Sequence, residues 1–113
     1  MRLIAMVSLC LSGALVTTAA LAAAGSVTIL APADGATLDA MEQNKVEYEV
    51  VPGPRGDHLH VYIDGSETGL LRQLKGTYTL ETLAPGAHEI CIKVVNKNHT
   101  PTGPEQCIHV TVE

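Results

Sequence analysis

Two histidines stand one residue apart in the segment "GDHLHVYIDG", residues 56–65. Side chains at positions i and i+2 of an extended strand project from one face about 7 Å apart, which lets His58 and His60 share one metal ion. The residues that alternate with them are apolar and mark the opposite, buried face of the strand. The pair therefore fits two interpretations: a metal site, or two polar residues on the exposed face of a sheet.

Two cysteines, Cys91 and Cys107, follow later in the chain and predict a disulfide, because an even pair in a small exported domain is usually oxidised. If the two face each other in a hairpin, the remaining facing pairs are Lys93 with Glu105 and Glu89 with His109. Closing this loop would contribute roughly 3 kcal/mol on the chain-entropy model. A catalytic redox pair is disfavoured, because such pairs usually occur as C-x-x-C.

The first residues predict export. Arg2 supplies a positive start, residues 3–21 are mostly apolar, and "LAAAG" offers the small residues that a signal peptidase reads. We expect a signal peptide over residues 1–24, cleaved after Ala24, and a periplasmic or secreted domain over residues 25–113. The apolar run is too short and too rich in alanine for a membrane anchor.

The remaining domain is acidic. The whole chain carries 7 Lys+Arg and 12 Asp+Glu, and removal of Arg2 leaves 6 − 12 = −6. This balance disfavours nucleic acid and anionic lipid as partners. Phe and Trp are absent, so the core must consist of Val, Ile and Leu, and a disulfide would reinforce it.

Alternation of apolar and polar residues with period two runs through the whole domain and predicts about seven short strands. Turn-forming sequences separate them, including "DGSETG" (64–69), "APG" (84–86) and a longer loop "NKNHTPTGPE" (96–105). The expected fold is all-β: a single immunoglobulin-like antiparallel β-sandwich. The expected strands are 26–30, 45–50, 58–64, 76–83, 88–95 and 106–112, with the remaining strand unassigned.

Several segments resemble known domains. "LAPADGATL" (30–38) resembles the opening of many bacterial immunoglobulin-like domains, and "LETLAPGAHEICIKV" (80–94) resembles the corner between strands E and F of fibronectin type III sandwiches. The series "HLHVYIDG", "LAPGAHEI", "NHTPTGPE" and "IHVTVE" resembles an uncharacterised family of exported bacterial domains with an H-x-H…P-G-x-H…N-H-T-P pattern. The resemblance implies this fold and an exported location.

Immunoglobulin-like topology adds a third histidine to the pair. The strand over 58–64 should run antiparallel beside the strand over 88–95, so the start of one lies near the end of the other. His99 follows the second strand and should approach His58 and His60. His88 belongs at the opposite end, where it would pin the corner as a tyrosine does in related sandwiches. His109 should face Glu89 on the outer surface.

The predicted metal ligands are therefore His58, His60 and His99, with Asp57, Glu105 or water completing the coordination. Imidazole and carboxylate ligands suit Cu(II) or Zn(II), and the affinity order favours copper. Met41 is the one thioether of the mature chain, and its position relative to the loops cannot be inferred from sequence.

The resulting hypothesis is a small exported protein that binds a transition metal, copper in the first place, as a carrier, sensor or sequestering protein. The alternative is an interaction module that contacts a protein, peptide or glycan of the cell envelope. Its contact surface would be the same loop end, where the loop over 96–105 is long enough for recognition, or the outer face of the strands over 58–64, 88–95 and 106–112. No nucleophile-elbow, phosphate-binding or paired acid–base motif is recognisable, so we do not expect an enzyme.

Overall fold

The structure is a computed structural model that describes residues 12–13 and 24–113. The predicted signal peptide, residues 1–24, lies outside the described residues except for three positions, and its cleavage stays a prediction. Within the described part of the chain, no helix has the length and apolar character needed to cross a membrane.

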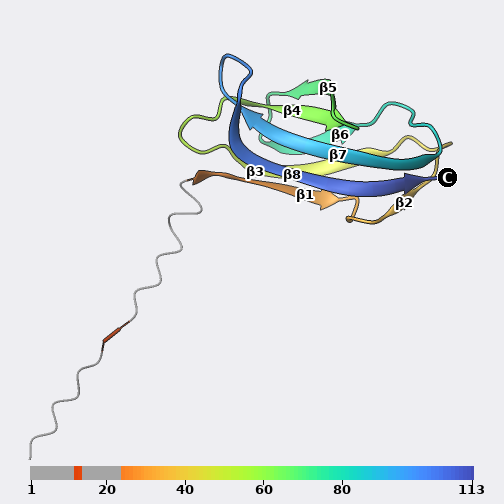
Figure 1. The fold of residues 1–113 in the computed structure, drawn as a ribbon, viewed down its shortest axis with the longest axis horizontal. Coiled ribbons are helices and arrows are strands. Elements are labelled where there is room, and N and C mark those ends of the chain that lie inside the picture. The colour runs from red at the N-terminus through yellow and green to blue at the C-terminus, as the bar shows by residue number, and fades with distance from the viewer. Residues whose placement is uncertain (1–11, 14–23) are drawn as a thin grey trace, which may run out of the picture.

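Eight strands form two largely antiparallel sheets packed face to face (Figure 1), which confirms the predicted immunoglobulin-like sandwich. One sheet has the order β1-β3-β6 and the other β2-β8-β7-β4-β5, the short β2 pairing with β8 in parallel. The strands are β1 Ser26–Ala31, β2 Thr37–Leu38, β3 Lys45–Val51, β4 His58–Ile63, β5 Ser66–Leu71, β6 Lys75–Thr79, β7 Gly86–Val95 and β8 Pro101–Val112.

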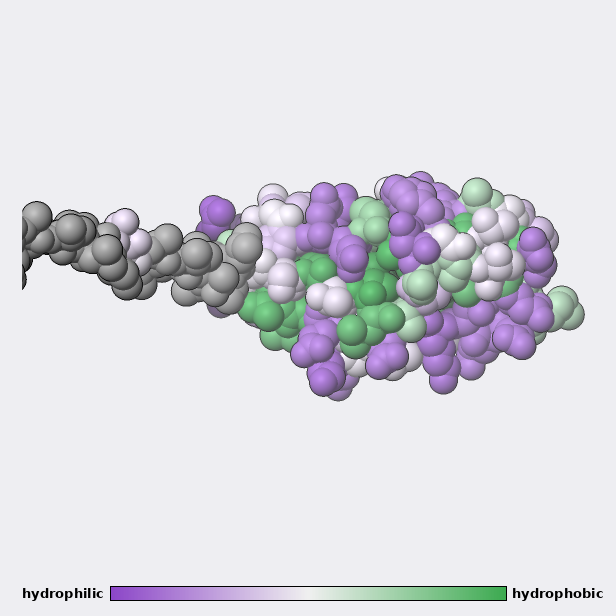
Figure 2. Space-filling model, turned by 90° about the horizontal axis from the view of Figure 1, so that it is seen from below, coloured by the Kyte–Doolittle hydropathy of each residue, from purple (hydrophilic) through white to green (hydrophobic). Residues whose placement is uncertain are grey.

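The core lies between the sheets and follows the period-two pattern of the sequence. Along β3, Val46, Tyr48 and Val50 are buried while the residues between them are exposed, as expected for a strand with one face on the core. The facing sheet contributes aliphatic side chains that are at most 2% exposed: Leu59, Val61, Ile90, Ile92, Val94, Ile108, Val110 and Val112. Figure 2 shows apolar residues gathered on the side of β1 and β8, with hydrophilic residues around them.

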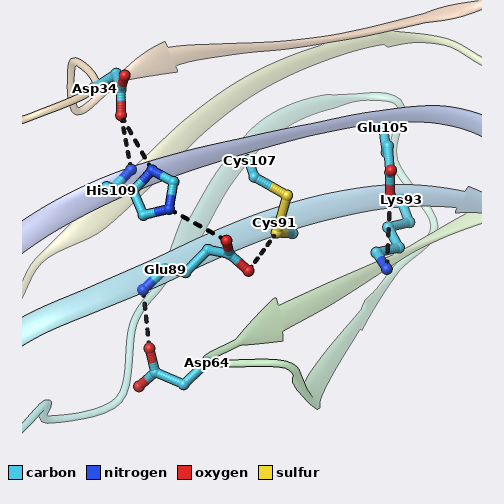
Figure 3. Close-up of a disulfide and its surroundings, with 8 residues drawn as sticks. All are labelled: Asp34, Asp64, Glu89, Cys91, Lys93, Glu105, Cys107 and His109. Atoms are coloured by element: carbon cyan, nitrogen blue, oxygen red, sulfur yellow. Dashed lines mark hydrogen bonds and ion pairs between the residues drawn. A yellow bond between two sulfur atoms is a disulfide. The ribbon is translucent and has the colours of Figure 1, made fainter.

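The β7–β8 hairpin has the register that the sequence predicted. Cys91 faces Cys107, Glu89 faces His109 and Lys93 faces Glu105. A disulfide joins Cys91 to Cys107 with a Cα–Cα distance of 4.0 Å, and Lys93 Nζ lies 3.5 Å from Glu105 Oε2 (Figure 3). The alternation of apolar residues, the pairing of opposite charges and the distance between the two cysteines therefore all specify the same β7–β8 register.

Two sequence predictions about the connections were wrong. The segment 64–69 is not all turn: Asp64 and Gly65 alone form a tight hairpin with φ values of 51° and 82°, and β5 follows at once. Asp-Gly with both residues at positive φ is the signature of a two-residue hairpin, which leaves the next residues free to pair. The loop after β7 is also shorter than expected, because β8 begins at Pro101 and not at residue 106.

Candidate metal site

Three imidazole rings meet at one end of the five-stranded sheet. His58 Nε2 lies 3.1 Å from His60 Nε2 and 3.0 Å from His99 Nδ1, and His60 Nε2 lies 3.1 Å from His99 Nδ1. The three nitrogens therefore form a nearly equilateral triangle. The predicted convergence of these residues is found, although His99 lies 41 residues after His58 in the chain.

The position of each histidine follows from the strand pairing. His58 and His60 lie on one face of β4, and His58 faces Val95 at the end of β7. The turn that leaves β7 therefore begins beside His58. Figure 1 shows the β3–β4 and β7–β8 connections at the same end of the sandwich, so His99 reaches the pair from the second connection.

Acidic residues lie beside the outer nitrogens of the β4 histidines. His58 Nδ1 donates a hydrogen bond to Asp57 Oδ2 at 2.9 Å. His60 Nδ1 lies 3.3 Å from Glu67 Oε1 without the geometry of a hydrogen bond. The Asp57 carboxylate therefore holds the ring proton of His58 on Nδ1 and leaves its Nε2 lone pair toward the triangle. Carboxylate–histidine pairs of this kind orient the ligands of many metal sites.

Both β4 histidines are 2% exposed, so the sequence interpretation that placed them on an exposed face was wrong about exposure. Burial lowers the pKa of His60; Glu67 opposes this effect, and the neighbouring His58 and His99 add to it. A lowered pKa keeps the His60 ring neutral at pH 7, which is the form that binds a metal. The hydrogen bond from His58 lowers the pKa of Asp57, which keeps that carboxylate ionised.

His99 is held in a strained backbone conformation by its turn. Its φ is 63°, a left-handed value that is uncommon for residues other than glycine. Asn96 fixes the turn: its side-chain Oδ1 accepts hydrogen bonds from the backbone N–H of Asn98 and of Thr100, at 2.9 and 3.1 Å. The N–H of His99 also donates to the carbonyl of Asn96 at 3.0 Å. These hydrogen bonds therefore hold His99 in a strained backbone conformation that directs its imidazole at the other two.

The connection before β4 is tightly packed against the end of β7. Asp57 N–H donates to the carbonyl of Val95 at 2.8 Å. At Gly56 an added Cβ would collide with the Pro52 carbonyl and would lie 2.7 Å from Val94 Cγ1, so only glycine fits. The position of Asp57, and through it the orientation of the His58 ring, depends on this close packing.

The triangle has the dimensions of a metal-binding face. With metal–nitrogen distances of about 2.0–2.1 Å, nitrogens 3.0–3.1 Å apart subtend about 90–100° at the ion. His58, His60 and His99 would supply three of the ligands of such an ion, and water or another ligand would complete its coordination. Where all three nitrogens carry lone pairs, these lone pairs repel each other, and a bound cation would remove that repulsion. In the described part of the chain, His60 Nδ1 is the one buried side-chain nitrogen or oxygen without a hydrogen bond.

Other residues considered as ligands lie outside the triangle. Asp57 contacts the outer nitrogen of His58 and does not point at the centre. Glu105 pairs with Lys93 on the β7–β8 hairpin. Met41 is 93% exposed in the connection before β3, at the end of the sandwich away from the histidines.

The two remaining histidines of the chain are placed as expected. His88 Nε2 donates to the carbonyl of Ala84 and its Nδ1 donates to Asp64 Oδ2, both at 2.6 Å, so this ring pins the corner before β7. His109 lies on the outer face of β8 with its Nε2 3.2 Å from Glu89 Oε2. Neither belongs to the three-imidazole cluster.

Sequence reasoning missed Glu67 and Asn96. Glu67 lay in a segment that was predicted to be a turn. The two-residue Asp64–Gly65 hairpin implies that a strand follows directly, and the pairing of that strand places Glu67 beside Tyr62. Asn96 lay in the long loop, and asparagine side chains commonly bond to backbone N–H groups in tight turns. Both signals were present in the sequence.

Comparison with solved structures confirms the fold. The fibronectin(III)-like modules of Clostridium thermocellum CbhA match with a TM-score of 0.62 at 17% identity, over 77% of this chain and 95% of that chain. An engineered protein matches with a TM-score of 0.55 at 18% identity, over 79% of this chain and 20% of that chain. A Jonesia denitrificans lytic polysaccharide monooxygenase matches with a TM-score of 0.52 at 17% identity, over 73% of this chain and 60% of that chain.

No protein-family model and no curated protein sequence matches the chain. The H-x-H…N-H-T-P family suggested by sequence is therefore not confirmed, whereas the broader resemblance to fibronectin and immunoglobulin-like domains is. At these identities the structural matches establish the architecture alone: this chain folds as a fibronectin type III-like, immunoglobulin-like β-sandwich.

Proposed function

We propose that this protein is an exported β-sandwich that binds a single transition-metal ion through His58, His60 and His99. The observation that carries the proposal is the triangle of three imidazole nitrogens 3.0–3.1 Å apart. Buried polar groups normally have partners, and one bound cation would satisfy all three facing ring nitrogens at once, whereas hydrogen bonds among them need a shared proton.

The ligand type favours copper(II) among the ions available to it. Neutral imidazole suits Cu(II), Zn(II) and Ni(II), and the affinity order of divalent ions places copper first. The acidic domain, with a charge of about −6 after removal of the predicted signal peptide, also favours the approach of cations. A carrier, sensor or sequestering protein needs these properties and no catalytic group.

Export is part of the proposal. The Cys91–Cys107 disulfide supports it, because structural disulfides persist in oxidising compartments such as the periplasm or the exterior. The predicted leader over residues 1–24 points the same way.

Calorimetric titration of the disulfide-intact domain with Cu(II) and Zn(II) at pH 7.5 and pH 5 tests the proposal. We expect one ion per chain at pH 7.5 and much weaker binding at pH 5, where protons compete for the imidazoles. His60→Ala should abolish tight binding. The matched control is His109→Ala, which removes a histidine that is 70% exposed and lies outside the cluster.

A titration in which His60→Ala binds as tightly as the unaltered protein would contradict the proposal. A flat titration of the unaltered protein would contradict it as well. The cluster would then serve to hold a proton among three rings, and a protein or glycan partner of the cell envelope would become the favoured ligand.

A further inference from the structure

A second group of metal-ligating side chains lies on the outer face of the β7–β8 hairpin, and it shares no residue with the histidine site. Glu89 and Cys91 are two residues apart on β7, and Cys107 and His109 are two residues apart on β8. The strand register places Glu89 opposite His109 and Cys91 opposite Cys107, so the four form a two-by-two arrangement. Figure 3 shows the Glu89 side chain between the imidazole and the disulfide.

The Glu89 carboxylate contacts both neighbours. Its Oε2 lies 3.2 Å from His109 Nε2 and its Oε1 lies 3.4 Å from Cys91 Sγ. One ligand atom each from Glu89, Cys91 and Cys107 can be chosen so that all lie within 4.8 Å of one another. Two sulfurs, one carboxylate and one imidazole are therefore already gathered on one surface.

The disulfide is what keeps this group from binding an ion, because thiolates and not disulfide sulfurs are the strong ligands. We propose that reduction of the Cys91–Cys107 bond converts the group into a second metal site, selective for a thiophilic divalent ion such as Zn(II). A dithiol reductant transfers two electrons and two protons to the sulfurs, the S–S bond breaks, and the reductant forms its own disulfide. On binding, the ion displaces the two thiol protons to solvent.

The four residues then form a ligand set of two thiolates, one carboxylate and one imidazole, a set compatible with tetrahedral Zn(II). An ion can reach the group, because the His109 side chain is 70% exposed and that of Glu89 is 42% exposed. A reductant can reach the disulfide at Cys107, which is exposed, although Cys91 is buried.

The hairpin itself holds the four residues in place once the bridge is open. Ile90 pairs with Ile108 between the two ligand rows, and both side chains are at most 2% exposed in the core. A one-residue slip of β8 would turn these apolar side chains to solvent, so the register does not depend on the disulfide alone.

Cobalt(II) is the probe that tests this site, because thiolate ligation gives a sulfur-to-cobalt charge-transfer absorption. The background is the chain with His58→Ala and His60→Ala, which removes the first site. After reduction with a phosphine, we expect one equivalent of Co(II) to bind with that absorption, and none before reduction. Circular dichroism should show that the reduced protein keeps its β structure.

Substitutions then assign the ligands. Cys107→Ser leaves one thiolate and should reduce the charge-transfer absorption by at least about half, and His109→Ala or Glu89→Gln should each weaken Co(II) binding at least about tenfold, as loss of ligand-shell contacts generally does. Glu105→Gln is the matched control: it removes a carboxylate on the same hairpin face that pairs with Lys93. It should leave Co(II) affinity unchanged.

The proposal is overturned if the reduced protein shows no thiolate absorption with Co(II). It is equally overturned if binding is indifferent to both His109→Ala and Glu89→Gln, or if the reduced protein binds Co(II) only as an unfolded chain. None of these results bears on the histidine site, which the background variant lacks.

Discussion

Proton placement on three imidazoles determines what the histidine cluster can bind. Because Asp57 accepts the Nδ1 proton of His58, the Nε2 lone pair of that ring is free for an ion. Glu67 stands beside His60 Nδ1 at 3.3 Å, near enough to attract a ring proton but without hydrogen-bond geometry. Without these carboxylates the ring protons could move to the inner nitrogens, where they would block metal binding.

Replacing the carboxylate beside His58 should therefore weaken the metal site. We expect Asp57→Asn to lower Cu(II) affinity about 10–100-fold, the usual effect of removing a carboxylate that orients a histidine ligand. Glu67→Gln should have a smaller effect, because its contact with His60 lacks hydrogen-bond geometry. Titration calorimetry measures both. Glu47→Gln, on the exposed face of the other sheet, is the control, and equal affinities in all four proteins would refute this role.

The corner histidine should give the fold a defined pH dependence. The Asp64 carboxylate and the Ala84 carbonyl raise the pKa of His88, and the Glu89 N–H together with His88 lowers the pKa of Asp64. The contribution of protonated His88 to the free energy of unfolding is complete below about pH 6.5 and is lost as pH rises through its raised pKa. The contribution of ionised Asp64 to the free energy of unfolding is present above about pH 3.9 and is lost as pH falls through its lowered pKa.

His88→Ala should accordingly destabilise the domain most between about pH 4 and 6.5. Urea unfolding at a series of pH values measures this difference. The same substitution made in an Asp64→Asn background should lose most of its pH dependence, because its charged partner is gone. Identical pH profiles in the two backgrounds would show that the ion pair is not the cause.

Among the elements of the fold, the strands with one buried face could be predicted from the sequence. Alternation specified β3, β4 and β7, and the charge pairs of Lys93 with Glu105 and Glu89 with His109 specified the β7–β8 register. A strand that lacks alternation of apolar and polar residues could not be predicted from the pattern alone. β5 reads Ser-Glu-Thr-Gly-Leu-Leu, a polar edge strand that can be recognised only from the tight turn before it.

The turn between β7 and β8 positions one of the three ligands, so its internal hydrogen bonds should affect metal binding. Asn96→Ala removes the acceptor for the N–H groups of Asn98 and Thr100 and should free His99 from its positive φ. We expect Cu(II) affinity to fall about tenfold, as for other residues that orient ligands. Stability without metal should change by only about 1 kcal/mol.

Asn98→Ala is the matched control for this turn, because it alters the neighbouring asparagine without removing the side-chain acceptor of Asn96. Its Cu(II) affinity should equal that of the unaltered protein. If Asn96→Ala binds Cu(II) with unchanged affinity, the strained turn does not position His99.

The whole molecule is a sandwich whose described core contains no Phe or Trp and depends on aliphatic side chains with a few tyrosines. The disulfide joins β7 to β8, and an ion at the histidine site would join β4 to the turn between them. Ligands that bind only the folded state stabilise it by mass action. Metal binding should thus be visible as a gain in the stability of the entire domain.

Thermal unfolding of the disulfide-intact domain measures this coupling. At an ion concentration about 100 times the Kd, binding adds about 2.7 kcal/mol to the free energy of unfolding. For a domain of this size the gain corresponds to a rise in Tm of about 10–20 °C. His60→Ala should show no comparable rise, and an equal rise in that variant would assign the effect to ions bound elsewhere.

The meeting of the three histidines could be predicted from the sequence, but their burial could not. Topology brought His99 to His58 and His60, since a strand start and a strand end must meet in this fold. The burial of the two β4 histidines could not be anticipated, because it depends on how the 96–100 turn closes over the sheet. The length of this turn depends on where β8 begins, at Pro101, and that start lies outside the alternating pattern.

A crystal structure of the copper-loaded, disulfide-intact protein, with anomalous diffraction recorded at the copper edge, tests the central claim most directly. The expected result is one anomalous peak at about 2.0–2.1 Å from His58 Nε2, His60 Nε2 and His99 Nδ1, the usual range for metal–imidazole distances. Anomalous density at other residues, or an empty triangle in crystals grown with saturating copper, would contradict it.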